Sequence, residues 1–443
     1  MLTRRSVLST LAAGACSAPL LTVPAAAQPQ QPKPNLLFLF ADDMGWSDVG
    51  FNGRKDWKTP NLDRLASQGT VFDRWYTACP LCAPSRAALM TGKYGIHNTV
   101  RGNSTDLPSS EVTIAEALRP QGYTTALIGK WHKGAKPDGT FTHPLDQGFD
   151  TTFGYLDARH AWEHFPKMFW RGRQEVPVSG YSSDILADEA IQFFRSAKKP
   201  FYLHLAFIEP HFLIEAPEED VKEYEGKFVE KDASQPYNAR YAAMIQRLDK
   251  SIGRVLKALD DQGLASNTLV VFTSDNGATF ESGNKGTSRF HDSNAPHRGQ
   301  KRSLEEGGIR VPGCVRWPGH VAAGKRSTAL TSTIDILPTF LAAAGGGAPN
   351  PAWKVDGINM LDVWTGKAAP PDRTLFWEFH TENTEMNAAM QGDFKLLEIG
   401  GQSFLYNVKD DPQERRPLHG EYPAVLQRLK KELKDWQATA VQP

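Results

Sequence analysis

The stretch Asn35-Leu36-Leu37-Phe38-Leu39-Phe40-Ala41-Asp42-Asp43 decides the fold class of this chain. Residues 36–41 form a short, continuously apolar run, which is typical of a strand buried on both faces and not of a surface helix. Two aspartates follow where the run ends. Because ligands of open α/β sheets bind beyond the carboxyl ends of the strands, we also expect a functional site at this point.

Similar apolar runs lie at 125–128, 201–208 and 268–273 and are further strand candidates. Amphipathic patterns with suitable start and stop residues predict helices between them, at 60–68, 112–118, 184–196 and 238–259. This alternation predicts an α/β fold with a large mixed, mostly parallel sheet sandwiched by helices.

Polar side chains follow the other predicted strands as well. In chain order they are Lys130 and His132, Glu209 and His211, and Asp275 and Asn276. Any one of them has a structural explanation, since an Asp after a strand often caps a turn. Their coincidence at the carboxyl ends of separate strands predicts one shared site.

The segment Cys79-Pro80-Leu81-Cys82-Ala83-Pro84-Ser85-Arg86-Ala87-Ala88-Leu89-Met90-Thr91-Gly92 predicts a helix that begins at Cys82 and stops at Gly92. The free amides of a helix start, together with Arg86, favour a bound anion. The Cys79-x-x-Cys82 spacing also fits a redox pair or half of a zinc site. However, the sequence has neither a second CxxC nor thioredoxin-like context.

On this segment the chain resembles the type I, formylglycine-dependent sulfatases of the alkaline phosphatase superfamily. The C-x-P-S-R and T-G signature is matched by Cys82, Pro84, Ser85, Arg86, Thr91 and Gly92. Supporting segments follow in the expected order at 35–45, 59–63, 129–132, 210–211, 274–277, 301 and 306–312. The resemblance implies an alkaline phosphatase/sulfatase-like fold with a small C-terminal antiparallel sheet plus helix, and the activity of a sulfuric ester hydrolase.

By that resemblance, Cys82 is oxidised to Cα-formylglycine by a formylglycine-generating or sulfatase-maturing enzyme, and the hydrate of this aldehyde is the nucleophile. The implied ligands of a calcium ion, or of magnesium, are Asp42, Asp43, the residue at position 82, Asp275 and Asn276. Oxygen donors of this kind suit calcium or magnesium better than zinc or copper.

The resemblance also implies roles for the cationic residues. Arg86, Lys130 and Lys301 would neutralise the sulfuryl oxygens. His211, with Lys301, would protonate the leaving oxygen. His132 would accept the proton whose loss re-forms the aldehyde and releases sulfate.

Three other hypotheses stay open from the sequence. One is an arylsulfatase of broad specificity. Another is a phosphodiesterase or phosphonate monoester hydrolase of the same superfamily, but these relatives tend to carry Asp-His where this chain has Asp275-Asn276. The third is a non-catalytic sulfated-glycan binder, which would be expected to lack the Cys, a Lys or a metal carboxylate, whereas none is missing here.

Two stretches rich in aromatic and cationic residues are candidate walls of a substrate pocket. They contribute His160, Trp162, His164, Arg171 and Arg173, and then Arg289, His291 and His297. Aromatic faces pack on sugar rings and cations pair with sulfates or uronates, so a sulfated saccharide is the leading substrate, with an aryl sulfate as the alternative. The same residues fit core and solvated surface equally well, because a sequence does not reveal exposure.

The composition excludes other classes of protein. Of 443 residues, 40% are hydrophobic and 23% charged, as in ordinary globular proteins and not in disordered ones. The net charge is zero, which argues against a general nucleic-acid binder. The 4 cysteines are too few for a disulfide-dense scaffold.

Residues 1–27 have the pattern of a secretory signal: Arg4-Arg5, an apolar stretch too short for a stable membrane span, and Ala25-Ala26-Ala27. The arginine pair resembles a twin-arginine signal. We therefore expect export by the twin-arginine machinery to the periplasm or medium of a bacterium, without stable membrane insertion. Lipid anchoring at Cys16 is not expected.

The predicted domain organisation continues with a linker at 28–34, a catalytic domain at 35–345 and a C-terminal subdomain at 346–443, which begins in the run Gly345-Gly346-Gly347. Within the subdomain, strand patterns occur at 374–379, 388–390, 394–398 and 403–407, and a helix pattern at 423–438.

Overall fold

A ten-stranded sheet organises the computed structural model, which describes residues 32–132, 140–197 and 200–441. The strand order is β11-β2-β10-β9-β1-β8-β4-β5-β6-β7. The strands are β1 (Asn35–Ala41), β2 (Thr70–Phe72), β4 (Thr124–Lys130), β5 (Thr151–Tyr155), β6 (Met168–Arg171), β7 (Gln174–Pro177), β8 (Phe201–Ala206), β9 (Thr268–Ser274), β10 (Gly313–Arg316) and β11 (Lys325–Ser327). The predicted secretory signal and most of the predicted linker lie outside the described residues.

The four strands predicted from the sequence are neighbours in the middle of this sheet. β1 pairs in parallel with β8 on one side and with β9 on the other, and β4 pairs in parallel with β8. Parallel neighbours end at the same edge, so the residues that follow these strands meet there. β10, β6 and β7 run antiparallel to their neighbours, which makes the sheet mixed but mostly parallel, as predicted.

Helices cover both faces of the sheet because side chains alternate along each strand. Leu37 and Leu39 of β1 belong to the core cluster that includes residues of α1 (Pro60–Ser67), α5 (Ser182–Ser196) and α7 (Tyr237–Asp261). Leu36, Phe38 and Phe40 belong to a second cluster, with residues of α4 (Ile114–Leu118) and α10 (Ile336–Ala343). The predicted helices at 60–68, 112–118, 184–196 and 238–259 are confirmed with end shifts of one or two residues.

Helix α2 (Cys82–Thr91) lies entirely in the interior, since each of its residues is buried. It begins at Cys82, after Leu81 in extended conformation, and its chain leaves through Gly92 in the left-handed region at φ 66°. This confirms the predicted start and stop. The burial explains the Ala-rich composition, because small side chains let the helix pack closely.

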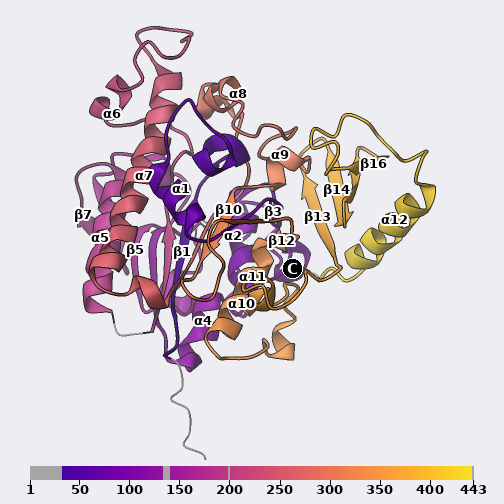
Figure 1. Cartoon of the computed structure of the whole chain (residues 1–443), viewed down its shortest axis with the longest axis horizontal. Coiled ribbons are helices and arrows are strands. Elements are labelled where there is room, and N and C mark those ends of the chain that lie inside the picture. Colours follow the sequence, from indigo (N-terminus) through magenta and orange to yellow (C-terminus); the bar gives the residue numbers. More distant parts are fainter. Residues whose placement is uncertain (1–31, 133–139, 198–199, 442–443) are drawn as a thin grey trace, which may run out of the picture. The chain divides into compact units, whose positions relative to one another are not determined.

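The C-terminal sheet consists of β13 (Thr374–His380), β14 (Glu385–Gln391), β15 (Phe394–Ile399) and β16 (Gln402–Asn407), which pair antiparallel in chain order. Helix α12 (Pro423–Gln437) packs against it (Figure 1). Both elements confirm the predicted C-terminal sheet and helix. Buried polar contacts join this sheet to the preceding part of the chain: Trp377 Nε1 donates to the Thr77 carbonyl, and Lys395 Nζ lies 3.0 Å from a carboxylate oxygen of Glu306 and 3.0 Å from one of Glu414.

The remaining strands and α-helices are short, and two of these strands pair in parallel as a separate two-stranded sheet. These elements are β3 (Trp75–Tyr76), β12 (Thr331–Ser332), α3 (Gly95–Asn98), α6 (Glu218–Lys222), α8 (Thr287–Phe290), α9 (Glu306–Ile309) and α11 (Leu361–Trp364).

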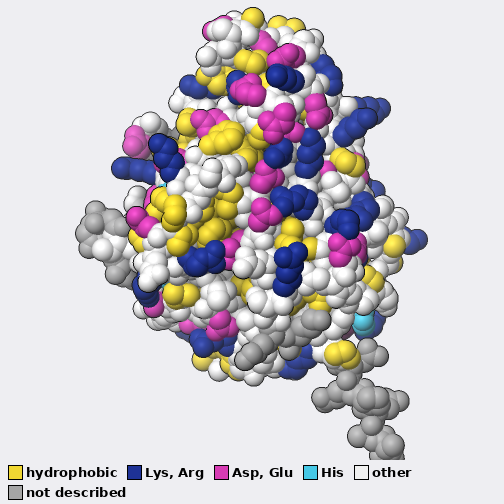
Figure 2. Space-filling view, turned by 90° about the vertical axis from the view of Figure 1, so that its left-hand side faces the viewer, with side chains coloured by type: hydrophobic (Ala, Val, Ile, Leu, Met, Phe, Trp, Pro, Cys, Tyr) yellow, Lys and Arg dark blue, Asp and Glu magenta, His cyan; other side chains and the backbone are white. Residues whose placement is uncertain are grey.

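Basic and acidic side chains are interspersed over the surface shown in Figure 2, as expected for a chain of zero net charge. Within the described part of the chain, none of the helices combines the length and the apolarity that crossing a membrane requires.

Candidate active site

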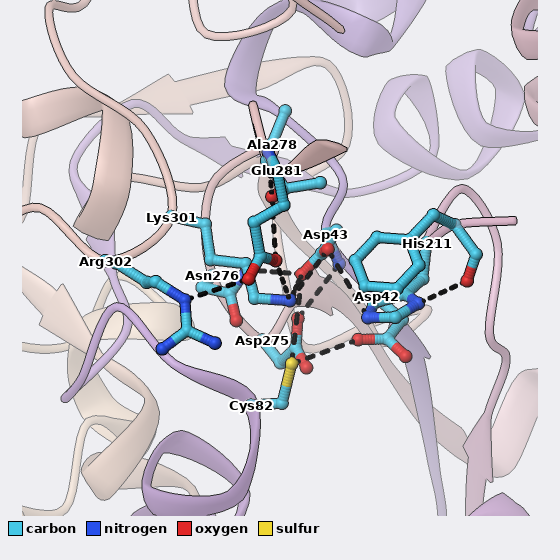
Figure 3. A network of polar contacts seen from close by, with 12 residues as sticks. Asp42, Asp43, Cys82, His211, Asp275, Asn276, Ala278, Glu281, Lys301 and Arg302 are labelled. Atoms are coloured by element: carbon cyan, nitrogen blue, oxygen red, sulfur yellow. Dashed lines mark hydrogen bonds and ion pairs between the residues drawn. The ribbon is translucent and has the colours of Figure 1, made fainter. Parts of the chain in front are cut away.

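Ten predicted site residues meet at the carboxyl edge of the central strands, and we call them the strand-end cluster (Figure 3 shows most of them). The cluster comprises Asp42, Asp43, Cys82, Arg86, Lys130, His132, His211, Asp275, Asn276 and Lys301. None of these residues is more than 6% exposed. So many ionisable side chains persist in the interior only when they are paired or hold a ligand.

Helix α2 contributes three residues of the sequence motif, and each of them contacts or faces the aspartates of the cluster. Cys82, at the start of the helix, faces the aspartates. Ser85 Oγ donates to the main-chain carbonyl of Asp275 at 2.6 Å and so fixes the end of β9. Arg86 donates from Nε and Nη2 to Asp275 Oδ2 at 3.0 and 2.8 Å, and its Nη2 lies 3.3 Å from Asp42 Oδ1.

The two lysines pair with the two aspartates that follow β1. Lys130 Nζ, from the end of β4, donates to Asp42 Oδ2. Lys301 Nζ lies 2.9 Å from Asp43. The amide of Asp43 donates to Asp275 Oδ1 at 3.0 Å, which ties β1 to β9. The cluster therefore balances three buried carboxylates with three buried cations.

The aspartates differ in how easily they ionise. Burial alone would raise the pKa of Asp42, but Lys130 and Arg86 outweigh burial and hold it well below its ordinary value. For Asp275, burial and then the negative charge of Asp42 raise the pKa to about 7, despite Arg86. Asp275 is thus short of positive charge, which a bound cation would supply.

Cys82 is a poor nucleophile as a thiol. Its Sγ lies 3.7 Å from Asp42 Oδ1 and 3.9 Å from Asp43 Oδ1. Burial raises the pKa of the thiol, with Lys301 and Lys130 opposing that shift only in part. Because the thiolate is the reactive form of cysteine, an unmodified Cys82 would be largely inert.

The arrangement fits a hard divalent cation. Asp42, Asp43, Cys82 and His211 each present a possible ligand atom, and these atoms lie within 4.8 Å of one another. The amide of Asn276 donates to Asp43 Oδ1 at 2.7 Å, so its own Oδ1 faces away from that bond and is buried without a partner among the described residues. Carboxylate oxygens beside an orphaned amide oxygen are a donor set for calcium or magnesium.

The cluster contains two histidines, each with one ring nitrogen available. His211 Nδ1 donates to the Phe212 carbonyl at 2.6 Å, and its Nε2 lies 3.7 Å from Asp43 Oδ2. His132 Nδ1 is buried without a partner among the described residues. Burial, followed by Lys301 for His211 and by Lys130 for His132, lowers both pKa values well below the ordinary value. Both rings are therefore neutral before an anion enters.

His164 does not line a pocket, contrary to the prediction from the sequence. It is fully buried, and its Nε2–H donates to the main-chain carbonyl of His211 at 3.0 Å. Its Nδ1 lies 3.7 Å from the buried carboxylate of Glu209, which also accepts from Ser182 Oγ. His164 thus holds the backbone on which His211 is carried.

Glu281 is a neighbour of the cluster that sequence reasoning missed. Its carboxylate lies 3.4 Å from Lys301 Nζ and accepts from Arg302 Nε at 2.9 Å (Figure 3). Burial would raise the pKa of Glu281, but Lys301 and Arg302 lower it to about 2. No sequence motif identifies Glu281, because its contact with Lys301 forms only when the loop that carries Lys301 folds back to the cluster.

Trp162 is a predicted pocket residue that is exposed and lies beside the cluster. Its side chain is 39% exposed and packs on Phe212, with ring centroids 5.5 Å apart. Phe212 in turn lies 4.2 Å from the His211 ring and 5.9 Å from Lys301 Nζ. An aromatic pair, with Trp162 exposed and Phe212 half-buried, therefore borders the cluster.

Arg171 and Arg173 are not brought to the cluster. Strand β6 runs back along β5, so that Arg171 lies opposite Phe153 and pairs with Glu189 of α5. Arg173 pairs with Asp146, which precedes β5. Both arginines therefore lie toward the amino end of β5, whereas the cluster lies at the carboxyl end of the sheet.

The other four predicted pocket residues have different surroundings. His160 Nε2–H donates to the Met168 carbonyl at 2.9 Å, and Arg289 is exposed over the ring of Phe280. His291 is buried and donates to the Asn238 carbonyl, which makes it part of the core.

His297 is also buried, edge-on to Trp46 at 5.1 Å. It faces a cavity whose lining contains no residue of the strand-end cluster.

This fold and cluster define a hydrolase built around a buried oxyanion and cation site. Comparison with known proteins gives the family: the Sulfatase family matches residues 34–346, and the C-terminal region of N-sulphoglucosamine sulphohydrolase matches residues 298–439. The chain belongs to the sulfatase family of the alkaline phosphatase superfamily and is a sulfuric ester hydrolase.

Relatives and solved structures agree with this assignment. N-acetylgalactosamine-6-sulfatase of Mus musculus is 34% identical over 404 residues, covering 84% of this chain and 72% of that protein. Arylsulfatase G of Mus musculus is 31% identical over 490 residues, covering 94% and 89%. The structure of Ps i-CgsB in complex with k-i-k-neocarrahexaose superposes with a TM-score of 0.82 at 33% identity, covering 93% of this chain and 94% of that one.

We predict that His164→Ala lowers kcat for a small aryl sulfate about 10- to 100-fold with little change in KM, because the His211 backbone loses its buried donor. His164→Gln, which keeps an N–H donor, should restore part of the loss. The pH dependence of kcat should change in His164→Ala, which a loss of stability alone would not cause.

Phe165→Ala is the matched control, since Phe165 is 48% exposed and packs on Tyr181, as His164 does, without contacting His211. Wild-type turnover in a folded His164→Ala protein would show that His164 does not position His211.

Proposed function

We propose that this protein hydrolyses a sulfate monoester of a carbohydrate and releases sulfate and an alcohol. The observation that carries the proposal is the setting of Cys82. Its side chain, buried at the start of α2, lies between two carboxylates and among the cations of Arg86, Lys130 and Lys301. A sulfuryl group bound at this position would be surrounded by cations that offset its negative charge.

Two groups complete this site in the proposal. Cα-formylglycine, formed from Cys82 by a maturation enzyme, supplies a hydrate as the nucleophile, which an inert buried thiol cannot. A calcium ion, or magnesium, held by Asp42, Asp43, Asp275 and Asn276 supplies positive charge against the sulfuryl oxygens.

The protein's own side chains then perform separate tasks. Arg86, Lys130 and Lys301 bind the sulfuryl oxygens and offset the charge that develops on them. The entering anion raises the proton affinity of His211, so that its Nε2 would take up a proton from solvent and pass it to the leaving oxygen as the S–O bond to the alcohol breaks. His132, through its unpaired Nδ1, would accept a proton from the group at position 82 as the bond of that group to sulfate breaks.

Several observations support a carbohydrate as the alcohol. The exposed Trp162 beside Phe212 offers an aromatic surface at the border of the cluster, of the kind on which sugar rings pack. One relative is named for N-acetylgalactosamine 6-sulfate chemistry, and one solved structure holds a neocarrahexaose.

We further propose that the protein is exported in a bacterium by the twin-arginine route and acts in the periplasm or outside the cell. This proposal rests on Arg4-Arg5 and Ala25-Ala26-Ala27 of the sequence.

The function is tested by assaying sulfate release from sulfated saccharides, with mass spectrometry of the Cys82 peptide from the same preparation. We expect turnover in protein made with a maturation enzyme, an aldehyde at position 82, and loss of turnover in Cys82→Ala. Phosphonate monoesters and phosphate diesters, assayed in parallel, should be much poorer substrates.

An unmodified thiol in a fully active preparation would contradict the proposed chemistry. Faster turnover of a phosphonate monoester than of every sulfate ester tested would instead favour the related hydrolases of the superfamily.

We predict that Trp162→Ala raises KM for a sulfated saccharide about 5- to 10-fold, as the loss of an aromatic contact worth about 1 kcal/mol implies. KM for a small aryl sulfate should change little, since that substrate does not reach the border of the site. The measurement is a comparison of KM values for the two substrates.

Arg171→Ala is the control, because Arg171 lies toward the amino end of β5 and should affect neither substrate. Equal effects of Trp162→Ala on both substrates would show that Trp162 does not contact the sugar.

A further inference from the structure

A cavity of about 600 Å³ lies apart from the strand-end cluster. Its walls come from the loop after β2, the end of β11, the segment that carries His297, and the C-terminal sheet near Asp393. None of the ten residues of the cluster lines it. Its volume falls in the range of about 300 to 1,000 Å³ that small-molecule sites occupy.

The cavity nevertheless opens on the same edge of the large sheet as the cluster. β2 is antiparallel to β10, and β10 is antiparallel to β9, so β2 runs in the direction of β9 and β1. Asp73 and Arg74, which follow β2, therefore leave the sheet at its carboxyl edge. Only β10 separates β2 from β9, which corresponds to about 10 Å across the sheet.

Positive charge dominates the lining. Among the described residues that form its walls, four are cationic and two are anionic. The cationic residues are Arg74, Arg310, Arg326 and Lys409, and the anionic ones are Asp73 and Asp393. The cavity therefore carries a net charge of plus two, although the whole chain has none.

The arginines are held in place, and Arg310 retains a donor for a ligand. Arg310 Nε donates to the Asp73 carbonyl at 2.8 Å, and Arg326 Nε donates to Asp73 Oδ1 at 3.0 Å. Arg326 also donates from Nη1 to the Phe51 carbonyl at 2.8 Å and from Nη2 to Asn52 Oδ1 at 3.1 Å. Arg74 is fixed by Asp393 at 3.1 Å. Within the described residues, Arg310 makes one further side-chain contact, from Nη1 to Glu306 at 3.3 Å, so its Nη2 amino group is available. A fixed guanidinium fork suits sulfate and carboxylate oxygens.

The rest of the wall is suited to a sugar. The indole of Trp46 and the ring of His297 meet edge-on at 5.1 Å, and both line the cavity. Burial and then Arg310 lower the pKa of His297 to about 3, so the ring adds no charge. An apolar aromatic wall opposite fixed cations is the combination that an acidic saccharide needs.

We propose that this cavity is a second binding site, which takes the sulfate or carboxylate group of an acidic saccharide unit and performs no chemistry. The identity of the ligand as a saccharide rests on the proposed function, whereas the anion chemistry rests on the lining alone. The site would hold a sulfated polymer, or a product of its hydrolysis, at the same edge of the sheet as the strand-end cluster.

The test uses the full-length Cys82→Ala protein, which binds ligands without turnover. Hydrogen–deuterium exchange is measured for peptides covering 70–76, 324–329 and 406–413, alone and with three probes: inorganic sulfate, a sulfated disaccharide, and the same disaccharide without sulfate. We expect the sulfated disaccharide to slow exchange in these peptides and the unsulfated one to have no effect.

Titration calorimetry then compares this protein with Arg326→Ala/Lys409→Ala, made in the same background. We expect the affinity of the site for the sulfated disaccharide to fall at least about tenfold, because two of its four cations are lost. The same double substitution in protein with Cys82 intact should leave aryl sulfate turnover unchanged, which also verifies folding. Arg416→Ala/Lys431→Ala removes the same charge from two exposed side chains outside the cavity and should have no effect.

Slowed exchange with inorganic sulfate as well as with the sulfated disaccharide would support an anion site that also accepts free sulfate. Equal protection by the unsulfated disaccharide would overturn the anion site, as would the absence of protection by any probe. These outcomes do not depend on turnover, so a failure of the proposed function would be seen separately, in the sulfate-release assay.

Discussion

The rest of the structure depends on one constraint, which is that three carboxylates share the interior with three cations. Asp42 and Asp43 follow β1, Asp275 follows β9, and each is essentially inaccessible to water. Ionised groups in such a place must be paired or must coordinate a ligand. The parallel pairing of β1 with β9 brings the acids together. Helix α2, the end of β4 and the loop that carries Lys301 supply the cations.

This constraint explains why several hydrogen bonds fix the backbone around the cluster. Ser85 holds the main chain of Asp275, His164 holds that of His211, and the Asp42 amide donates to the Glu209 carbonyl at 3.2 Å. Each bond fixes a backbone that carries a charged or reactive side chain. An oxyanion site needs this rigidity, because its donors must be aimed before the substrate arrives.

The sequence was sufficient to predict the central strands, because buried parallel strands are continuously apolar and their carboxyl ends carry polar residues. Asp275 could be placed in this way, and Cys82 could be placed by the helix pattern that begins at it. Lys301 came only from a family resemblance, since no strand or helix pattern leads to it. The contact of Glu281 with Lys301 and the position of Arg171 could not be predicted. The first depends on how the loop that carries Lys301 folds, and the second depends on the direction of β6 relative to β5.

In the proposed site, the carboxylates of the cluster hold a hard divalent cation beside position 82. The decisive measurement is equilibrium calcium binding, made by calorimetry on chelator-treated protein. We expect saturable binding by the wild-type chain, much weaker binding by Asp43→Asn, and unchanged binding by Asp146→Asn, whose exposed carboxylate pairs with Arg173 away from the cluster. Calcium binding that survives in Asp43→Asn, or no binding of calcium or magnesium by the wild-type chain, would contradict the proposed site.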